Sequence, residues 1–200
     1  MMGVEEDVIH AEKLNKVFSI KGKKPLTALN GLSLSVKKGE LAAVIGPDGA
    51  GKTTLMRLIA GLMNPTSGSL TVLGMDSVKD GEEIQSRISY MPQKFGLYED
   101  LTVQENLDLY ADLHGVPQEK RPERFGKLLD MMGLAPFTGR FAGKLSGGMK
   151  QKLGLACTLV RSPDLLLLDE PTVGVDPLSR RELWKILKTF VKEEHLSIFV

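Results

Sequence analysis

The segment from residue 46 to residue 53 has the composition and spacing of a phosphate-binding loop. It reads Gly46-Pro47-Asp48-Gly49-Ala50-Gly51-Lys52-Thr53. Glycines let successive backbone N–H groups turn inward around phosphate oxygens, and the N-terminus of a following helix adds partial positive charge. Lys52 can neutralise the β- and γ-phosphate oxygens, and the Thr53 hydroxyl can bind Mg²⁺. The pattern therefore predicts a site for the phosphates of a nucleotide.

The residues on both sides of this loop support the prediction. Five consecutive apolar residues, 41–45, predict a strand buried on both faces, as in a parallel sheet covered by helices. Beyond the loop, apolar residues recur at the spacing of one helix face, at Leu55, Leu58, Ile59 and Leu62. The alternative is a glycine-rich turn with an unrelated lysine, and the order of strand, loop and helix disfavours it.

Two acidic residues, Asp169 and Glu170, follow a second apolar strand of four leucines, 165–168. Ligands of parallel sheets bind at the carboxyl ends of the strands, so we expect these carboxylates to face the same site as the loop. Asp169 is then placed to hold the Mg²⁺ shell, and Glu170 to polarise a water molecule in line with the γ-phosphate. Alone, the pair would indicate a solvated turn; together with the loop it predicts a catalytic site.

A third segment, Ser146-Gly147-Gly148, opens another predicted helix. Ser146 is a natural N-cap, and the glycines leave backbone N–H groups accessible, so the segment predicts a second anion-binding helix N-terminus. As a bare Ser-Gly-Gly turn it would mean little. It becomes a specific signal because it occurs together with the phosphate-binding loop upstream and the acidic pair downstream.

The elements that position these motifs follow an α/β order. Alternating apolar residues at Leu32, Leu34 and Val36 predict half-buried antiparallel strands that end at a Lys-Gly-Glu turn, 38–40. From Thr102 the β pattern fades, and Thr102 with Glu105 predicts a capping box at a helix start. We interpret 94–145 as a helical subdomain inserted in one nucleotide-binding domain, 1–200. Strand patterns return at 165–168 and 197–200.

Composition limits the classes of protein that fit. The chain has 200 residues, with 26 Lys and Arg against 25 Asp and Glu, so the formal net charge is +1 and no global field attracts nucleic acid or an anionic membrane. No apolar stretch approaches the roughly 18 residues of a membrane span. The acidic opening, 1–7, does not resemble a signal peptide, and one cysteine cannot form an internal disulfide. A cytoplasmic protein is therefore expected.

In this order, the motifs resemble those of the ATP-binding subunits of ABC transporters. The resemblance runs along essentially the whole chain and is closest to the multidrug and lipid exporter group related to daunorubicin exporters, through residues 46–55 and 95–102. Within that group the chain is similar to the first ATPase half of tandem multidrug-export ATP-binding proteins. The resemblance implies a P-loop NTPase core with a RecA-like, mostly parallel sheet, an N-terminal antiparallel β subdomain, an inserted α-helical subdomain and a truncated C-terminus.

The resemblance also assigns roles to individual residues. Residues 145–149 correspond to the signature motif, Gln93 to the Q-loop glutamine and 175–177 to the D-loop. Catalysis is assigned to Glu170, Lys52 and Gln93, and Mg²⁺ binding to Thr53, Gln93 and Asp169. ATP contacts are assigned to Phe18, Gly46, Pro47, Asp48, Gly49, Ala50, Gly51, Lys52, Thr53, Thr54, Ser146, Gly147 and Gly148. Phe18 would stack on adenine, the alternative being a half-buried strand residue. Phe95, Leu97 and Tyr98 fit loop anchoring and partner docking equally well.

The family resemblance implies ATP and Mg²⁺ as ligands and two kinds of partner. Ser146 to Gly148 of one domain would close over ATP held by Lys52 of a second nucleotide-binding domain, and transmembrane permease subunits would hold the pair at the inner face of the membrane. No nucleic acid is expected as a partner. A soluble ABC-type ATPase acting on nucleic acid or ribosomes is the alternative, disfavoured by the compact insert between Thr53 and Ser146. A P-loop kinase or GTPase has no use for the Ser-Gly-Gly segment.

Three positions depart from the usual family pattern. Asp48 stands where Asn or Ser is more common, although this exporter group tolerates Asp, and Met149 replaces the usual Gln. The switch histidine of the family lies a few residues beyond the strand that starts at Ser197, where this sequence ends. We therefore expect a chain truncated at its C-terminus that hydrolyses ATP poorly.

Overall fold

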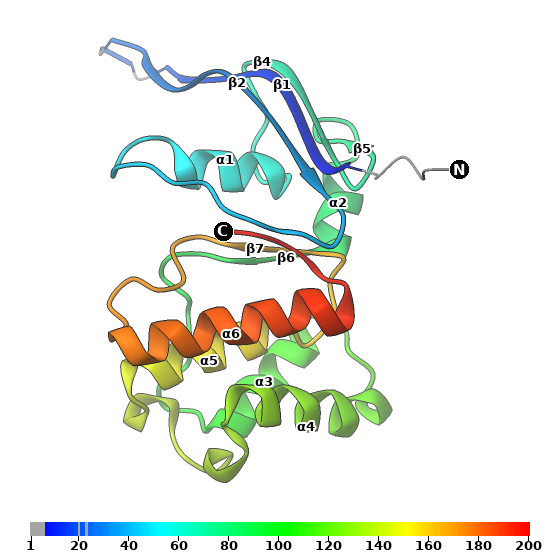
Figure 1. The fold of residues 1–200 in the computed structure, drawn as a ribbon, viewed down its shortest axis with the longest axis vertical. Coiled ribbons are helices and arrows are strands. Elements are labelled where there is room, and N and C mark those ends of the chain that lie inside the picture. Colours follow the sequence, from blue (N-terminus) through cyan, green and yellow to red (C-terminus); the bar gives the residue numbers. More distant parts are fainter. Residues whose placement is uncertain (1–6, 20, 23) are drawn as a thin grey trace. The chain divides into compact units, whose positions relative to one another are not determined.

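The computed structural model describes residues 7–19, 21–22 and 24–200 (Figure 1). The acidic opening, taken above as evidence against a signal peptide, lies almost wholly outside these residues. The chain forms two compact units. Unit 1 comprises residues 1–90, 164–169 and 191–200, and unit 2 comprises 91–163 and 170–190. The predicted single domain over 1–200 with a helical subdomain at 94–145 stays a prediction.

Unit 1 contains an antiparallel sheet in the order β2-β1-β4-β5. Its strands are β1 (Asp7–Phe18), β2 (Leu26–Lys37), β4 (Ser67–Val72) and β5 (Met75–Asp76). Leu32 and Leu34 are half-buried while Ser33 and Ser35 between them are exposed, and the strand ends at a turn over 38–39. The alternation at 32–37 thus correctly predicted half-buried antiparallel strands.

A second sheet of unit 1 has the order β3-β8-β7-β6 and carries the acidic pair at the end of one strand. Its strands are β3 (Leu41–Ala42), β6 (Ile88–Met91), β7 (Leu165–Leu168) and β8 (Ser197–Phe199). β8 pairs in parallel with both β3 and β7. All four leucines of β7 have no exposed surface, as a strand buried on both faces requires. Two helices complete the unit, α1 (Lys52–Ile59) and α2 (Gly81–Arg87).

The prediction of a doubly buried strand at 41–45 was wrong. Only two residues form β3, and the Ile45 side chain is 93% exposed. β3 lies at the edge of the sheet, where β8 is its one neighbour, so an apolar run of this type is not buried on both sides. The apolar stripe also extended too far, because α1 ends at Ile59 and Leu62 is 55% exposed.

Unit 2 is helical, with α3 (Val103–Leu113), α4 (Arg121–Met132), α5 (Gly147–Thr158) and α6 (Pro177–Glu194), which belongs to this unit up to Phe190. Short 3₁₀ turns occur at Gln118–Lys120, Ala135–Phe137 and Ala142–Lys144. The capping box at Thr102 and Glu105 is confirmed: each side chain bonds the backbone N–H of the other residue. Val103, Leu107 and Ala111 bury one face of α3 completely.

Strands and helices together confirm the α/β class, with an antiparallel β sheet, a parallel sheet and a helical unit. Within the residues that the structure describes, no helix combines the length and apolar composition that a membrane crossing requires.

Candidate functional site

The predicted phosphate loop lies between β3 and α1, and its backbone requires glycine. Gly49 and Gly51 have φ values of +78° and +93°. At Gly51 a Cβ atom would also collide with the carbonyl oxygen of Ala28 on β2. Gly51 is the N-cap of α1 and supplies no side-chain hydrogen bond, so the first N–H groups of α1 have no side-chain acceptor from their own cap. An anion that arrives here meets the positive end of a helix.

Lys52 folds back over this loop. Its Nζ donates to the carbonyl oxygens of Gly46, at 2.9 Å, and Pro47, at 3.1 Å. These neutral acceptors hold the ammonium group at the loop, and the phosphate oxygens of a nucleotide are stronger partners for a cation. Asp48 is exposed.

Thr53 and Asp169 are 116 positions apart in the sequence and meet at one point of unit 1. The Thr53 hydroxyl donates to Oδ1 of Asp169 at 3.1 Å. Asp169 is 3% exposed, and its Oδ2 accepts a hydrogen bond from the Tyr90 hydroxyl at 3.1 Å. Burial, and then the nearby Asp169 carboxylate, raise the pKa of Tyr90 above its ordinary value.

The donor set at Thr53 and Asp169 fits Mg²⁺. A hydroxyl and a carboxylate are hard oxygen ligands, and Mg²⁺ in nucleotide sites is bound by one or two protein oxygens together with phosphate oxygens and water. In the described part of the chain there is no group of three or more His, Cys, Asp and Glu side chains that could hold a metal ion.

In unit 2, two of the predicted site residues, Gln93 and Glu170, form a hydrogen-bonded pair. Nε2 of Gln93 donates to Oε2 of Glu170 at 2.9 Å, although 77 positions separate them. Glu170 has a φ of +54°, in the left-handed region that non-glycine residues rarely adopt. Backbone strain of this kind persists where the surroundings impose it, and it occurs often at functional sites. The unusual backbone at Glu170 and its bond to Gln93 both single out this carboxylate.

The segment assigned to the signature motif, 145–149, spans the start of α5, also in unit 2. Ser146 is the N-cap, as predicted, and its Oγ accepts from the N–H of Met149 at 3.3 Å. Gly148 is buried against α6: a Cβ there would lie 2.6 Å from Cβ of Ser179. Gly147 is exposed, and a Cβ added to it would lie 3.8 Å from the Gly174 carbonyl oxygen, which is an ordinary van der Waals contact. One of the two glycines is thus required by packing.

The segment after Gln93 is held in place by an aromatic contact and by backbone hydrogen bonds. The Phe95 ring stacks on Tyr110 of α3, with 5.1 Å between centroids, and an added Cβ on Gly154 of α5 would lie 3.0 Å from this ring. Phe95 therefore anchors the loop. Tyr98 is 53% exposed, while its backbone N–H and carbonyl oxygen bond the buried Asn106 side chain at 3.0 Å each. The loop is fixed and the Tyr98 ring faces outward.

Phe18 ends β1 and is half-buried. The Lys16 ammonium lies 5.3 Å from the centre of the Phe18 ring and donates to the carbonyl oxygen of Asn64 at 2.7 Å. Stacking of adenine on Phe18 stays a prediction, as do the assigned roles of the other site residues.

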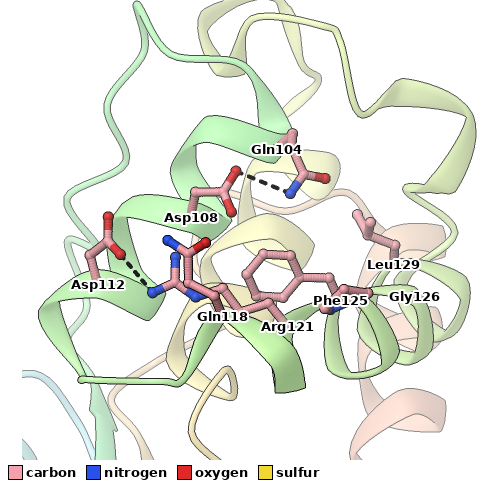
Figure 2. Close-up of a pocket in the computed structure, with 9 residues that line it drawn as sticks. Gln104, Asp108, Asp112, Gln118, Arg121, Phe125, Gly126 and Leu129 are labelled. Carbon is pink, nitrogen blue, oxygen red and sulfur yellow. Dashed lines mark hydrogen bonds and ion pairs between the residues drawn. The ribbon is translucent and has the colours of Figure 1, made fainter.

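Unit 2 also contains a hollow of about 650 Å³ between α3 and α4, shown in Figure 2, that includes none of the predicted residues. Its polar side chains pair within the hollow: Gln104 donates to Asp108 at 3.2 Å, and Arg121 pairs with Asp112 at 2.6 Å. The Phe125 ring packs beside them. The two aspartates and Arg121 give this hollow no large excess of either charge.

Sequence reasoning missed one residue of unit 1 that the structure adds to the site, Tyr90, whose hydroxyl donates to Asp169. Arg57, on α1, opposes the rise in the pKa of Tyr90. The only available signal for Tyr90 was its position three residues before Gln93, and a tyrosine at the end of a strand is ordinarily explained by packing.

Comparisons with known proteins agree on one family. The sequence model of the family described as "ABC transporter" matches residues 29–173. The chain is 59% identical over 168 residues to the "Probable multidrug ABC transporter ATP-binding protein YbhF" of Escherichia coli K12, covering 84% of this chain and 29% of that protein. It is 38% identical over 197 residues to the "Methionine import ATP-binding protein MetN 2" of Rhodococcus jostii, covering 96% of this chain and 58% of that protein.

Among solved structures, the chain is similar to a dimeric, post-hydrolysis state of the ATP-binding cassette MJ0796 bound to ADP and Pi. The TM-score is 0.82 and the identity 27%, over 96% of this chain and 86% of the other. The chain thus spans most of a cassette of known structure. It spans less than two thirds of the length of each of the two curated relatives named above.

Proposed function

Because the chain belongs to the ABC transporter ATP-binding proteins, we propose that it binds and hydrolyses ATP to drive export of a drug- or lipid-like substrate through separate permease subunits. The observation that carries the proposal is the Thr53–Asp169 hydrogen bond of 3.1 Å. It joins the phosphate loop to the buried carboxylate at the end of β7, as nucleotide hydrolysis with Mg²⁺ requires.

The residues of unit 1 would hold the nucleotide. The N–H groups at the start of α1 and the Lys52 ammonium would bind the β- and γ-phosphates, and the Phe18 ring would stack on adenine. Thr53 and Asp169 would hold Mg²⁺, which when bound neutralises charge on the phosphate oxygens. The carbonyl oxygens of Gly46 and Pro47 hold Lys52 at the loop until phosphate replaces them.

The residues of unit 2 would supply hydrolysis and closure. Glu170 accepts a hydrogen bond from Gln93, and as a general base it would take a proton from the attacking water. Ser146, Gly147 and Gly148 would close over the ATP of a second nucleotide-binding domain. The dimer of the similar cassette bound to ADP and Pi supports this arrangement.

Export as the direction of transport rests on the name of the E. coli relative, a probable multidrug transporter protein. An import protein of 38% identity shows that family membership does not fix the direction. The permease partners would place this protein at the cytoplasmic face of the membrane. Co-purification with a membrane protein would support this reading, whereas recovery of nucleic acid or ribosomes alone would contradict it.

The first experiment is Glu170→Gln with Mg-ATP, followed by light scattering. Loss of the base leaves ATP bound and unhydrolysed, so the 21.9 kDa mass should double only when ATP and Mg²⁺ are both present. The matched control adds Lys52→Ala to the same chain, which should remain monomeric because nucleotide no longer binds. Hydrolysis that persists in Glu170→Gln would exclude Glu170 as the base.

A further inference from the structure

The Tyr90 hydroxyl contacts the buried carboxylate of unit 1. It donates to Oδ2 of Asp169 at 3.1 Å. Thr53, on α1, donates to the other oxygen of Asp169, also at 3.1 Å. Two hydrogen bonds therefore join α1, β6 and the residue after β7.

The chemistry of these groups fixes the direction of the bonds. An ionised carboxylate can only accept, so the single phenolic proton of Tyr90 is directed to Oδ2 of Asp169. Each Asp169 oxygen consequently has its own donor, Tyr90 on Oδ2 and Thr53 on Oδ1.

We infer that Tyr90 is a positioning residue for Asp169: it holds Oδ2 so that the Oδ1 edge stays directed toward Thr53 and the Mg²⁺ of a bound nucleotide. This inference rests on the proposed function. A carboxylate that is 3% exposed has little water to satisfy its second oxygen, so without the phenol it would rotate toward another donor. A carboxylate free to rotate binds Mg²⁺ less well because its orientation must be fixed on binding.

A purely structural role for Tyr90 makes a different prediction. The Tyr90 ring packs against the hydrophobic core of unit 1, and Tyr90→Phe keeps this ring while removing the hydroxyl. If the ring alone matters, Tyr90→Phe should leave every property of the nucleotide site unchanged. If the hydroxyl positions Asp169, the variant should lose affinity only when Mg²⁺ is present.

The test measures binding of a non-hydrolysable ATP analogue by calorimetry, in EDTA and in Mg²⁺, with the full chain. We expect Tyr90→Phe to bind as the native protein does in EDTA and roughly fivefold more weakly in Mg²⁺, the effect of one lost hydrogen bond. The matched control is Ser89→Ala on the same strand. Ser89 is 5% exposed, its hydroxyl has no hydrogen-bond partner in the described part of the chain, and its side chain points to the opposite face from Tyr90.

Equal Mg²⁺ dependence in Tyr90→Phe and the native protein would overturn the inference. So would an equal loss in EDTA and in Mg²⁺. Failure of the native protein to bind the analogue at all would instead refute the proposed function.

Discussion

The two glycine-containing segments at helix starts, 46–53 and 146–148, differ in their helix caps and in the cations near them. At the first, Gly51 caps α1 without a side-chain bond, and Lys52 brings a cation to the same loop. At the second, the Ser146 hydroxyl already bonds the N–H of Met149, and Lys150 of α5 pairs with Glu99 at 2.6 Å. The first segment can therefore bind phosphate alone, whereas the second has one donor satisfied and needs a ligand presented from outside its own loop.

The number of glycines therefore does not distinguish a primary phosphate site from an auxiliary one. What distinguishes them is whether a side chain caps the helix and whether an ammonium group lies at the loop. Both segments place helix N–H groups at the start of a helix, but only the first combines an uncapped N-terminus with an ammonium group held by weak, replaceable acceptors. Substitutions at the two segments should accordingly affect nucleotide binding to different degrees.

Lys52→Ala should have the largest effect on nucleotide binding. It removes charge-assisted bonds to phosphate, so we expect the affinity for Mg-ATP, measured by calorimetry, to fall roughly a hundredfold. Lys150→Ala is the matched control at the other segment. Its ammonium is engaged with Glu99, so monomer affinity should stay within about twofold of native. Equal losses in the two variants would contradict the contrast between the segments.

Gly51→Ala should have the next largest effect, a loss of stability caused by strain in the backbone. Alanine at a φ of +93° is strained, and its Cβ would collide with the Ala28 carbonyl oxygen, a backbone atom that cannot rotate away. We expect the free energy of unfolding, from urea denaturation, to fall by about 2–3 kcal/mol. Gly49→Ala has a positive φ but open space around its Cβ, and should cost about 1 kcal/mol. A larger loss in Gly49→Ala would refute the role of the collision.

Gly148→Ala should destabilise the chain by about 2 kcal/mol, because its Cβ would lie 2.6 Å from Cβ of Ser179. Gly147→Ala should change the free energy of unfolding by less than about 0.5 kcal/mol, since this glycine is exposed with no close contact. Ser179→Gly should recover part of the stability of Gly148→Ala. If it recovers none, the cost of Gly148→Ala has another origin.

How far the sequence could predict this fold depends on the number of sheet neighbours, which local pattern does not encode. The leucines at 165–168 and the apolar run at 41–45 have the same signal, yet β7 has a neighbour on each side and β3 has one. The strand prediction was therefore confirmed for the former and wrong for most of the latter. Local signals such as the Thr102 capping box were confirmed because they depend on residues three apart.

The candidate site divides in a similar way. The strand-end position of Asp169 predicted that its carboxylate would face the phosphate loop, and the Thr53 hydroxyl lies 3.1 Å from Oδ1 of Asp169. The sequence could not predict Tyr90 as a second donor to Asp169, because a side-chain hydrogen bond between separate strands leaves no periodic trace. Nor could it predict that Gly148 is fixed by Ser179, since that requires knowing how closely α5 and α6 pack.

Ser146→Ala should have the smallest effect on the folded chain. It tests most directly whether the segment 146–148 takes part in nucleotide binding by the monomer. Loss of the cap to Met149 should lower the free energy of unfolding by about 1 kcal/mol and leave the affinity of the monomer for Mg-ATP unchanged. In the Glu170→Gln background it should raise the ATP concentration needed for the mass to double, because the segment proposed to close over the ATP of the second domain loses a hydrogen-bond donor. Ser146→Thr restores a hydroxyl and should restore most of both properties. A loss of monomer affinity in Ser146→Ala would mean that the second segment also belongs to the primary phosphate site.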